Sequence, residues 1–351
     1  MHPYFAERLK ALRMRHGLSL EQLAEAAGGV VSKQAISRYE KGEMMPSSSV
    51  LLALAKALNA SLDDFFREPT VHLQEVNYRR RASLGVKRRK QIEGEILERL
   101  ERYAELELIT NKHLPFENPI RHMHVGDGDA AELAAEQLRQ SWGLGSDPIQ
   151  NVLELLEEHG CKVIEVQNAP DNFDGLSAWS DGQPVVGINA AFPNDRKRFT
   201  ALHELAHLLL GLDGEHEERK ENERLCNRFA GAMLIPAKAL EREFIGERKH
   251  FSMQELRLLK QHWGISVQAL IYRAKDVGLI DDQLFQRANQ HIRRNDLHRN
   301  EGLEIPHQER TQRFDQLLYY GLSEGLISYS KAAHLRGVSL TQLQEDVGKI
   351  L

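Results

Sequence analysis

The sequence predicts a mostly helical protein of several domains, one of which is a small α+β domain. Three observations support this fold class. The chain has 351 residues, which is more than a single hydrophobic core usually organises. Apolar residues recur with the 3.6-residue period of a helix through most of its length. Two short apolar runs, at residues 161–166 and 184–189, have instead the pattern of strands.

Composition limits the classes of function. No apolar run is long enough to cross a bilayer, and the first residues lack the apolar core of a signal peptide. The two cysteines, Cys161 and Cys226, are too few for a disulfide framework, which favours a reducing, cytoplasmic location. The net charge of −5 does not by itself indicate nucleic-acid binding, so any DNA-binding surface has to be local.

The N-terminal segment, residues 1–69, is expected to form a domain of five short helices. Helix, tight turn and second short helix is the layout of a helix-turn-helix module that reads DNA. The start and stop signals are serine caps and glycines. The five helices are expected from Phe5 to before Gly17, from the Ser19–Gln22 capping box to before Gly28, from Ser32 to about Glu40, over Val50–Leu58, and after a cap at Ser61.

If residues 32–41 form the recognition helix, its early side chains face the major groove of DNA. Gln34 can make a bidentate contact with adenine, and Lys33 can reach the acceptors of guanine. Ser37, Arg38 and Lys41 suit contacts with phosphates or with further bases. Two other interpretations stay open: the polar face of this module could be only solvated, or it could dock a protein.

Residues 70–128 are expected to form a basic linker. Residues 71–78 alternate weakly like a strand, and residues 91–109 keep a helical period. Between them lies a run that could follow DNA phosphates or could simply be the solvated start of the helix. This run, residues 79–90, contains no acid and seven basic residues: Arg79, Arg80, Arg81, Lys87, Arg88, Arg89 and Lys90.

Residues 129–285 are expected to form the α+β domain, and residues 286–351 a helical C-terminal region. A helical pattern at 129–144 and another after Asp147 precede the first strand. Residues 172–178 look like a turn-rich connection between the two strands. Further helices are expected from about Arg196, at 218–234, 251–263, 266–277 and 281–299, and around Gly325 and Gly337.

The most informative motif is His203-Glu204-Leu205-Ala206-His207, within an apolar run. On a helix the two histidines lie one turn apart on the same face, where their imidazoles can bind one Zn²⁺. Glu204 can then act as the general base toward a water that the metal activates. The spacing therefore indicates metal-assisted hydrolysis. The alternative is a helix whose two histidines are merely surface or core residues.

A catalytic zinc usually has three protein ligands, so a third must come from elsewhere in the chain. Glu223 is favoured because it lies on an otherwise apolar helix face, where an unpaired carboxylate is costly. Asn227, one turn further on, could hydrogen-bond a ligating histidine. Cys226 could also be proposed as a ligand, but a small buried side chain is the favoured interpretation. Candidates for an extra donor to the oxyanion, which the sequence does not rank, are His262, Tyr272 and Arg273.

Residues 5–66 resemble the Xre/Cro-type helix-turn-helix of phage repressors. The resemblance is carried by LSLEQLA at 18–24, SKQAISRYEKG at 32–42 and Pro46. The turn at 28–31 is slightly longer than usual, and Leu20 stands where such domains often have Gln. This resemblance implies binding to a DNA operator, and such modules often pair, so a homodimer is expected.

Residues from about 129 to 280 resemble the ImmA/IrrE metallopeptidases. The match is a chain of short motifs and is far more specific than the five-residue metal signature alone. Cys226 stands where this family often has Ala. The motifs are AAEQLR at 134–139, WGL at 142–144, DPI at 147–149, LLE at 155–157, GLS at 175–177, Ile188-Asn189, RFT at 198–200, HELAH at 203–207, Glu223, CNRFA at 226–230 and LIP at 234–236.

This second resemblance implies a zincin-like metallopeptidase whose zinc is held by His203, His207 and Glu223. It also implies site-specific cleavage of an Xre-type repressor after stress or damage. Together the two resemblances predict a DNA-binding transcriptional regulator with a zinc-dependent endopeptidase that acts in a stress or defence response. Two alternatives stay open: a ligand-sensing repressor whose zinc domain does not cleave, and a regulator that cleaves its own chain near residues 79–90.

Overall fold

The computed structural model describes residues 2–78, 84–212, 216–245, 248–295, 297, 301, 305–306 and 308–348. The chain forms two compact units. The first unit contains residues 1–74, 80–113 and 317–351, and the second contains residues 75–79 and 114–316. The end of the chain therefore groups with its beginning. The bounds of the four sequence segments expected above stay predictions.

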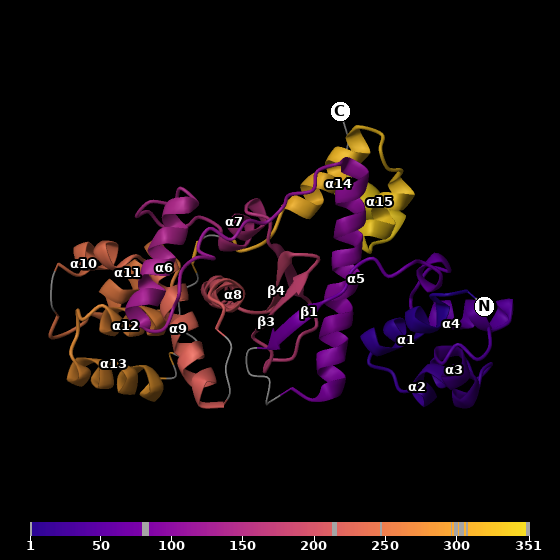
Figure 1. Cartoon of the computed structure of the whole chain (residues 1–351), viewed down its shortest axis with the longest axis horizontal. Coiled ribbons are helices and arrows are strands. Elements are labelled where there is room, and N and C mark those ends of the chain that lie inside the picture. The colour runs from indigo at the N-terminus through magenta and orange to yellow at the C-terminus, as the bar shows by residue number, and fades with distance from the viewer. Residues whose placement is uncertain are drawn as a thin grey trace. The chain divides into compact units, whose positions relative to one another are not determined.

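The first unit begins with the five expected helices, which the structure confirms (Figure 1). Serine side chains cap α2 and α3, because Ser19 accepts a hydrogen bond from Gln22 N and Ser32 one from Ala35 N. The apolar faces meet in one core that includes Phe5, Leu9, Leu23, Ile36, Leu54 and Phe65. The helices are α1 (Phe5–Arg15), α2 (Leu20–Ala26), α3 (Lys33–Glu40), α4 (Ser48–Ala57) and the 3₁₀ helix η1 (Asp63–Phe65).

A long helix, α5 (Val86–Thr110), completes the first unit together with α14 (Arg313–Ser323), α15 (Tyr329–Arg336) and α16 (Leu340–Val347). α5 contacts α1 on one side and α15 on another. Figure 1 shows α15, in yellow, beside α5. The C-terminal helices therefore help to bury α5, which is a role that their sequence pattern did not indicate.

The second unit contains a four-stranded sheet with the strand order β1-β3-β4-β2. β2 (Lys162–Val166) is parallel to β4 (Gln183–Asn189), and β3 (Gly175–Ser180) is antiparallel to β4. β1 (Gln74–Tyr78) forms one edge. The expected strands are present, but the expected turn-rich connection at residues 172–178 is wrong, because most of it belongs to β3. A tight hairpin turn at Asp181-Gly182, with φ of 50° and 79°, fixes this pairing.

Helices cover the sheet and build the rest of the second unit. α8 packs against β3 and β4, and α9 packs against both α8 and α6. Among the described residues, no helix combines the length and the apolar composition that a membrane span needs. The helices are α6 (Gly128–Ser141), α7 (Val152–Glu158), α8 (Asn194–Leu209), α9 (His216–Leu234), α10 (Ala237–Phe244), α11 (Met253–Trp263), α12 (Val267–Asp276) and α13 (Asp282–Arg294).

After α13 the chain returns to α8 through the described part of residues 297–312, which we call the return segment. Its Glu309 forms an ion pair with Arg198 of α8, and both side chains are almost fully buried. The same carboxylate accepts a hydrogen bond of 2.8 Å from Val152 N at the start of α7. Arg198 also donates to Ile149 O at 2.6 Å. One buried charge pair therefore ties α8, α7 and the return segment together.

A second glutamate of the return segment makes a similar contact. Glu301 pairs with Lys260 at 2.7 Å and accepts a hydrogen bond of 2.9 Å from Val267 N at the start of α12. Lys260 in turn pairs with Asp195, in the first turn of α8, at 2.7 Å. The N-terminal half of α8 is thus held by two buried ionic groups.

The other side of α8 lies against β3 at a glycine. A Cβ atom on Gly175 would stand 2.8 Å from Thr200 Cγ2 and 3.0 Å from the Cγ and Oε1 atoms of Glu204. Real Cβ atoms rarely come so close to a neighbour, so only glycine lets the strand and the helix approach this far.

Replacing Glu309 by Ala is expected to destabilise the second unit by about 3–5 kcal/mol, because it leaves the Arg198 charge buried and unpaired. Denaturant unfolding followed by tryptophan fluorescence measures this, since Trp142, Trp179 and Trp263 all lie in the second unit. Asp282→Ala is the matched control, because Asp282 is exposed and its pair with the half-buried Lys275 is worth under about 1 kcal/mol. Equal losses in the two variants would contradict the prediction.

Gly175→Ala is expected to cost about 1–3 kcal/mol, because the added methyl group overpacks the contact between β3 and α8. The same fluorescence measurement reports it. Gly128→Ala is the control, since a Cβ there meets no atom within 4 Å and its stability should be unchanged or slightly higher. An unchanged unfolding free energy for Gly175→Ala would show that α8 can move away from the strand.

Candidate metal centre

Two histidines of α8 face the same side of that helix. His203 is completely buried and His207 keeps 13% of its side chain exposed. Their Nε2 atoms lie 3.1 Å apart. The local sequence explains the placement, because the leucines and alanines around them form the apolar face that packs into the core. The two imidazoles are therefore carried on a helix whose position is fixed by packing.

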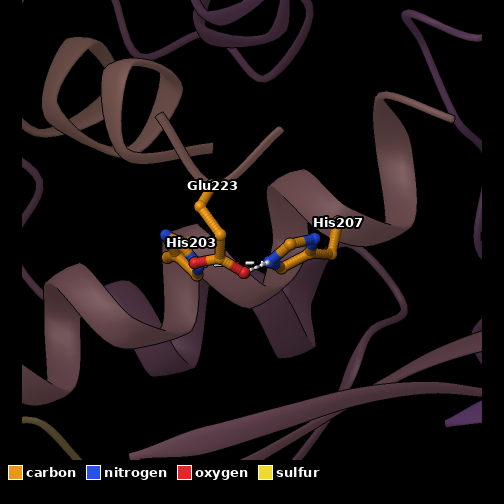
Figure 2. A group of neighbouring side chains, drawn as sticks. All are labelled: His203, His207 and Glu223. Carbon is orange, nitrogen blue, oxygen red and sulfur yellow. Dashed lines mark hydrogen bonds and ion pairs between the residues drawn. The ribbon is translucent and has the colours of Figure 1, made fainter. Parts of the chain in front are cut away.

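Glu223 comes from α9 and completes the group. Its Oε2 atom lies 3.2 Å from His203 Nε2, and its Oε1 atom lies 3.3 Å from His207 Nε2. Figure 2 shows the carboxylate lying between the two imidazole rings. Because 45% of the Glu223 side chain is exposed, the group opens to solvent on the side of α9. The structure therefore brings together the three residues that the sequence suggested as ligands.

The spacing of these atoms fits a zinc ion. Zinc bonds to imidazole nitrogen and carboxylate oxygen are about 2.0–2.1 Å long, so two ligands of a tetrahedral ion lie about 3.3 Å apart. Here the two histidine Nε2 atoms lie 3.1 Å apart, and the Glu223 oxygens lie 3.2 Å from His203 Nε2 and 3.3 Å from His207 Nε2. The donor set is also that of catalytic zinc sites, which have three protein ligands and one open position.

The electrostatics of the group favour a cation. Burial raises the pKa of Glu223, but hydrogen bonds from His203 and His207 outweigh it and hold that pKa well below its ordinary value. Burial lowers the pKa of His207, but hydrogen bonds with Cys226 and Glu223 outweigh it and raise that pKa to about 11. The ionised carboxylate thus stabilises positive charge between the two rings, which is what a metal ion would supply.

Glu204 follows His203 directly and is completely buried. Its side chain lies against the backbone of β3 at Gly175, as described above. It is also close enough to His207 to raise the pKa of that histidine through its charge. The role of Glu204 as a general base stays a prediction.

Two neighbouring residues of α9, Cys226 and Asn227, differ in their surroundings. Asn227 is exposed on α9, and its hydrogen bond to a ligating histidine stays a prediction. The structure instead places Cys226, which is completely buried, with its Sγ atom 3.5 Å from His207 Nδ1. The buried position of Cys226 agrees with the favoured interpretation, but its contact with the histidine was not foreseen. His207 lies 19 residues earlier in the chain, so nothing in the sequence around Cys226 indicated this contact.

The three candidates for an additional donor differ in their surroundings. Arg273 is buried, makes two hydrogen bonds with the carboxylate of Glu132 and donates to Ile235 O at 3.0 Å. Its guanidinium therefore serves the packing of α12 against α6 and the end of α9. His262 is exposed, and Tyr272 keeps 45% of its surface exposed.

The expected DNA-contacting residues share the outer face of α3. Lys33, Gln34, Arg38 and Lys41 are exposed and Ser37 is half-buried, whereas Ile36 and Tyr39 point into the core. Two of the cations make loose surface pairs, Lys33 with Glu21 at 3.2 Å and Arg38 with Glu43 at 3.3 Å. In the basic run, Arg79, Arg80 and Arg81 lie outside the described residues.

Comparison with known protein families identifies two domains. Residues 9–65 match the helix-turn-helix family, and residues 156–275 match the IrrE N-terminal-like domain of peptidase family M78. The second match contains His203, Glu204, His207 and Glu223.

Individual relatives agree with the first match. The chain is 37% identical over 59 residues to YgzD of Bacillus subtilis, an uncharacterised HTH-type transcriptional regulator, and covers 86% of that protein. It is 36% identical over 110 residues, 31% of this chain, to a protein of Pyrococcus abyssi with the provisional name of an HTH-type transcriptional regulatory protein. The match spans about a third of that protein, 32% of its length.

One solved structure, the apo form of ComR from S. thermophilus, aligns with 99% of this chain and 91% of its own at 13% identity. Its TM-score of 0.18 is too low to support an argument. The assignment therefore rests on the two family matches and the relatives. The chain belongs to the helix-turn-helix transcriptional regulators through its Xre-type N-terminal domain, and it carries an IrrE N-terminal-like domain of peptidase family M78 in the same polypeptide.

Proposed function

We propose that this protein is a DNA-binding transcriptional regulator whose second unit is a zinc-dependent endopeptidase. The observation that carries the proposal is the convergence of His203, His207 and Glu223 within hydrogen-bonding distance of one another, beside the buried Glu204. Histidines that only fill the core would not need a carboxylate from a second helix between them.

His203, His207 and Glu223 would hold the zinc ion, which supplies Lewis acidity that polarises a carbonyl group and lowers the pKa of water. Glu204 takes a proton from the attacking water and passes it to the leaving amine. The packing of α8 against β3 keeps Glu204 in place for both transfers.

The proposed substrate is a repressor-type protein, either a separate Xre-type repressor or this chain itself. The presence of a DNA-binding domain in the same polypeptide supports it, because that domain would bring the peptidase to operators where such repressors bind. The proposed setting is a stress or defence response in the cytoplasm. A DNA operator and a second copy of the chain are the other proposed partners.

A second candidate is a ligand-sensing repressor whose metal domain does not cleave. One feature of the first unit favours it: a cavity of about 350 Å³ lies between α1 and α5. Leu12 and Met14 of α1 line it together with Val71 and Leu97. A small molecule bound there would alter the contact between the DNA-binding helices and α5.

Glu204→Gln is expected to lower the rate of cleavage by about 10²–10⁴-fold, because the amide cannot accept the proton, while zinc stays bound. The test incubates the zinc-loaded full chain with an Xre-type repressor encoded beside its gene, and also alone. Cleavage is followed by gel electrophoresis and zinc content by elemental analysis. Glu221→Gln, on the exposed side of α9, is the matched control and should cleave normally. Equal cleavage by the Glu204 and Glu221 variants would refute the peptidase.

Gln34→Ala is expected to weaken binding to an operator selected from random DNA by about 1–3 kcal/mol, because a bidentate contact with a base is lost. The measurement is a footprint titration of the full chain. Lys56→Ala, an exposed cation of α4, is the control for a change elsewhere on the domain. His203→Ala should keep the footprint, since the metal centre lies in the other unit. An unchanged affinity for Gln34→Ala would exclude α3 as the reading helix in this orientation.

A further inference from the structure

The start of α5 concentrates positive charge outside both the metal centre and α3. Lys87, Arg88 and Lys90 lie in its first turns and are exposed. The sequence from 79 to 90 contains no acidic residue. Arg89, also in the first turn, is half-buried and already interacts within the fold, so it does not enter the argument.

Helix stability does not explain these cations. The N-terminus of a helix is the positive end of its dipole, and each cation placed there is unfavourable by about 0.3–1 kcal/mol. The N-cap is Gly85, which provides no side-chain hydrogen bond, and the first turn has no acid to compensate. The partner that the structure records for Arg88 is the neutral amide of Gln91, at 3.1 Å. An external anion would remove the penalty.

The position of the cations points to the kind of anion. Gln91 lies one turn after Lys87 and Arg88 on the same helix face. Its side chain fills the space in front of Gly17, where a Cβ atom would come within 1.9 Å of Gln91 Nε2. Gly17 lies in the short link between α1 and α2, two residues before the cap of α2 at Ser19. The basic turns of α5 therefore stand beside the start of α2.

In helix-turn-helix domains the helix before the recognition helix crosses the DNA backbone. Here that helix is α2, since α3 carries the expected reading residues. A DNA backbone that reaches the start of α2 comes next to the basic turns of α5, whose long side chains extend to phosphates. Side chains that do not reach the bases can still bind the phosphates along a duplex, because phosphate contacts do not depend on sequence.

We propose that Lys87, Arg88 and Lys90 bind phosphates of the DNA that flanks the bases read by α3, so that the DNA interface continues onto α5. This inference rests on the proposed DNA binding by the first unit. Each phosphate that a protein neutralises contributes about 0.9 to the slope of log affinity against log salt concentration. The proposal therefore has a measurable signature that differs from that of a base contact.

The test uses the full-length chain and a fluorescein-labelled 30-base-pair duplex of arbitrary sequence, with anisotropy titrations between 50 and 300 mM KCl. The triple variant K87Q/R88Q/K90Q is expected to bind at least about tenfold more weakly at 100 mM KCl and to lower the salt slope by about 2.7. Lys87→Gln and Arg88→Gln alone should each lower it by about 0.9. These single variants keep the test decisive if the triple variant folds poorly.

Lys112→Gln is the matched control, because this exposed cation follows the C-terminal end of the same helix, about 37 Å away at 1.5 Å per residue. Its salt slope should equal that of the unaltered protein. The melting temperature of the Lys87 and Arg88 variants should be unchanged or higher, since a cation has left the positive end of the helix. A lower melting temperature with an unchanged slope would assign these residues to the fold and overturn the proposal.

Failure of the underlying function gives a different result. If the unaltered protein binds no duplex, the proposed DNA binding is refuted and this inference with it. If K33Q/R38Q in α3 weakens binding while the α5 variants keep the full affinity and slope, α3 alone contacts DNA and the extension onto α5 is refuted.

Discussion

The second unit depends on the fixed position of α8. This helix carries both histidines and Glu204. It must be held from several directions if their atoms are to stay within a few tenths of an ångström of the positions that binding one ion requires. The buried Arg198–Glu309 pair holds its first half, together with the Asp195–Lys260–Glu301 group. Buried charges are poor sources of net stability, but an arrangement that leaves one unpaired is strongly disfavoured. The ion pairs therefore specify one position of α8 more than they strengthen the fold.

The same reasoning applies to the metal centre. The Glu223 carboxylate lies beside both imidazoles, and hydrogen bonds with Cys226 and Glu223 raise the pKa of His207 despite its burial. The contact of Cys226 Sγ with His207 Nδ1 leaves the Nε2 atom directed at Glu223. Partners on the far nitrogen of a ligating histidine fix its orientation and proton state. In this chain a thiol occupies the place where such a partner is usually a carboxylate or a carbonyl oxygen.

Sequence patterns predicted what depends on neighbours along the chain. Caps and apolar spacing placed the five N-terminal helices and α8, and the cost of an unpaired carboxylate singled out Glu223. β3 was missed because its small and polar residues form a strand only through pairing with β4. The roles of Glu301 and Glu309 could not be predicted from their sequence neighbours. Glu301 pairs with Lys260 and Glu309 with Arg198, and both partners lie far away in the sequence. Asn227 shares a helix face with Glu223, but helical spacing alone does not fix burial, because Glu223 is half-exposed and Asn227 exposed while Ala230 on the same face is buried.

A helix-turn-helix domain and a peptidase-family domain in one chain have a physical consequence for the proposed function. A tethered catalytic site acts at an effective concentration set by its tether rather than by its cellular concentration. A repressor bound near the same operator would then be cleaved faster than free repressor, without a tighter peptide-binding site. The half-exposed Glu223 is compatible with this arrangement, because under the proposed function selection would come from where the protein is bound. The choice of repressor to be cleaved would then depend on which DNA the first unit binds. The extent of the DNA interface of that unit would therefore influence the choice of substrate.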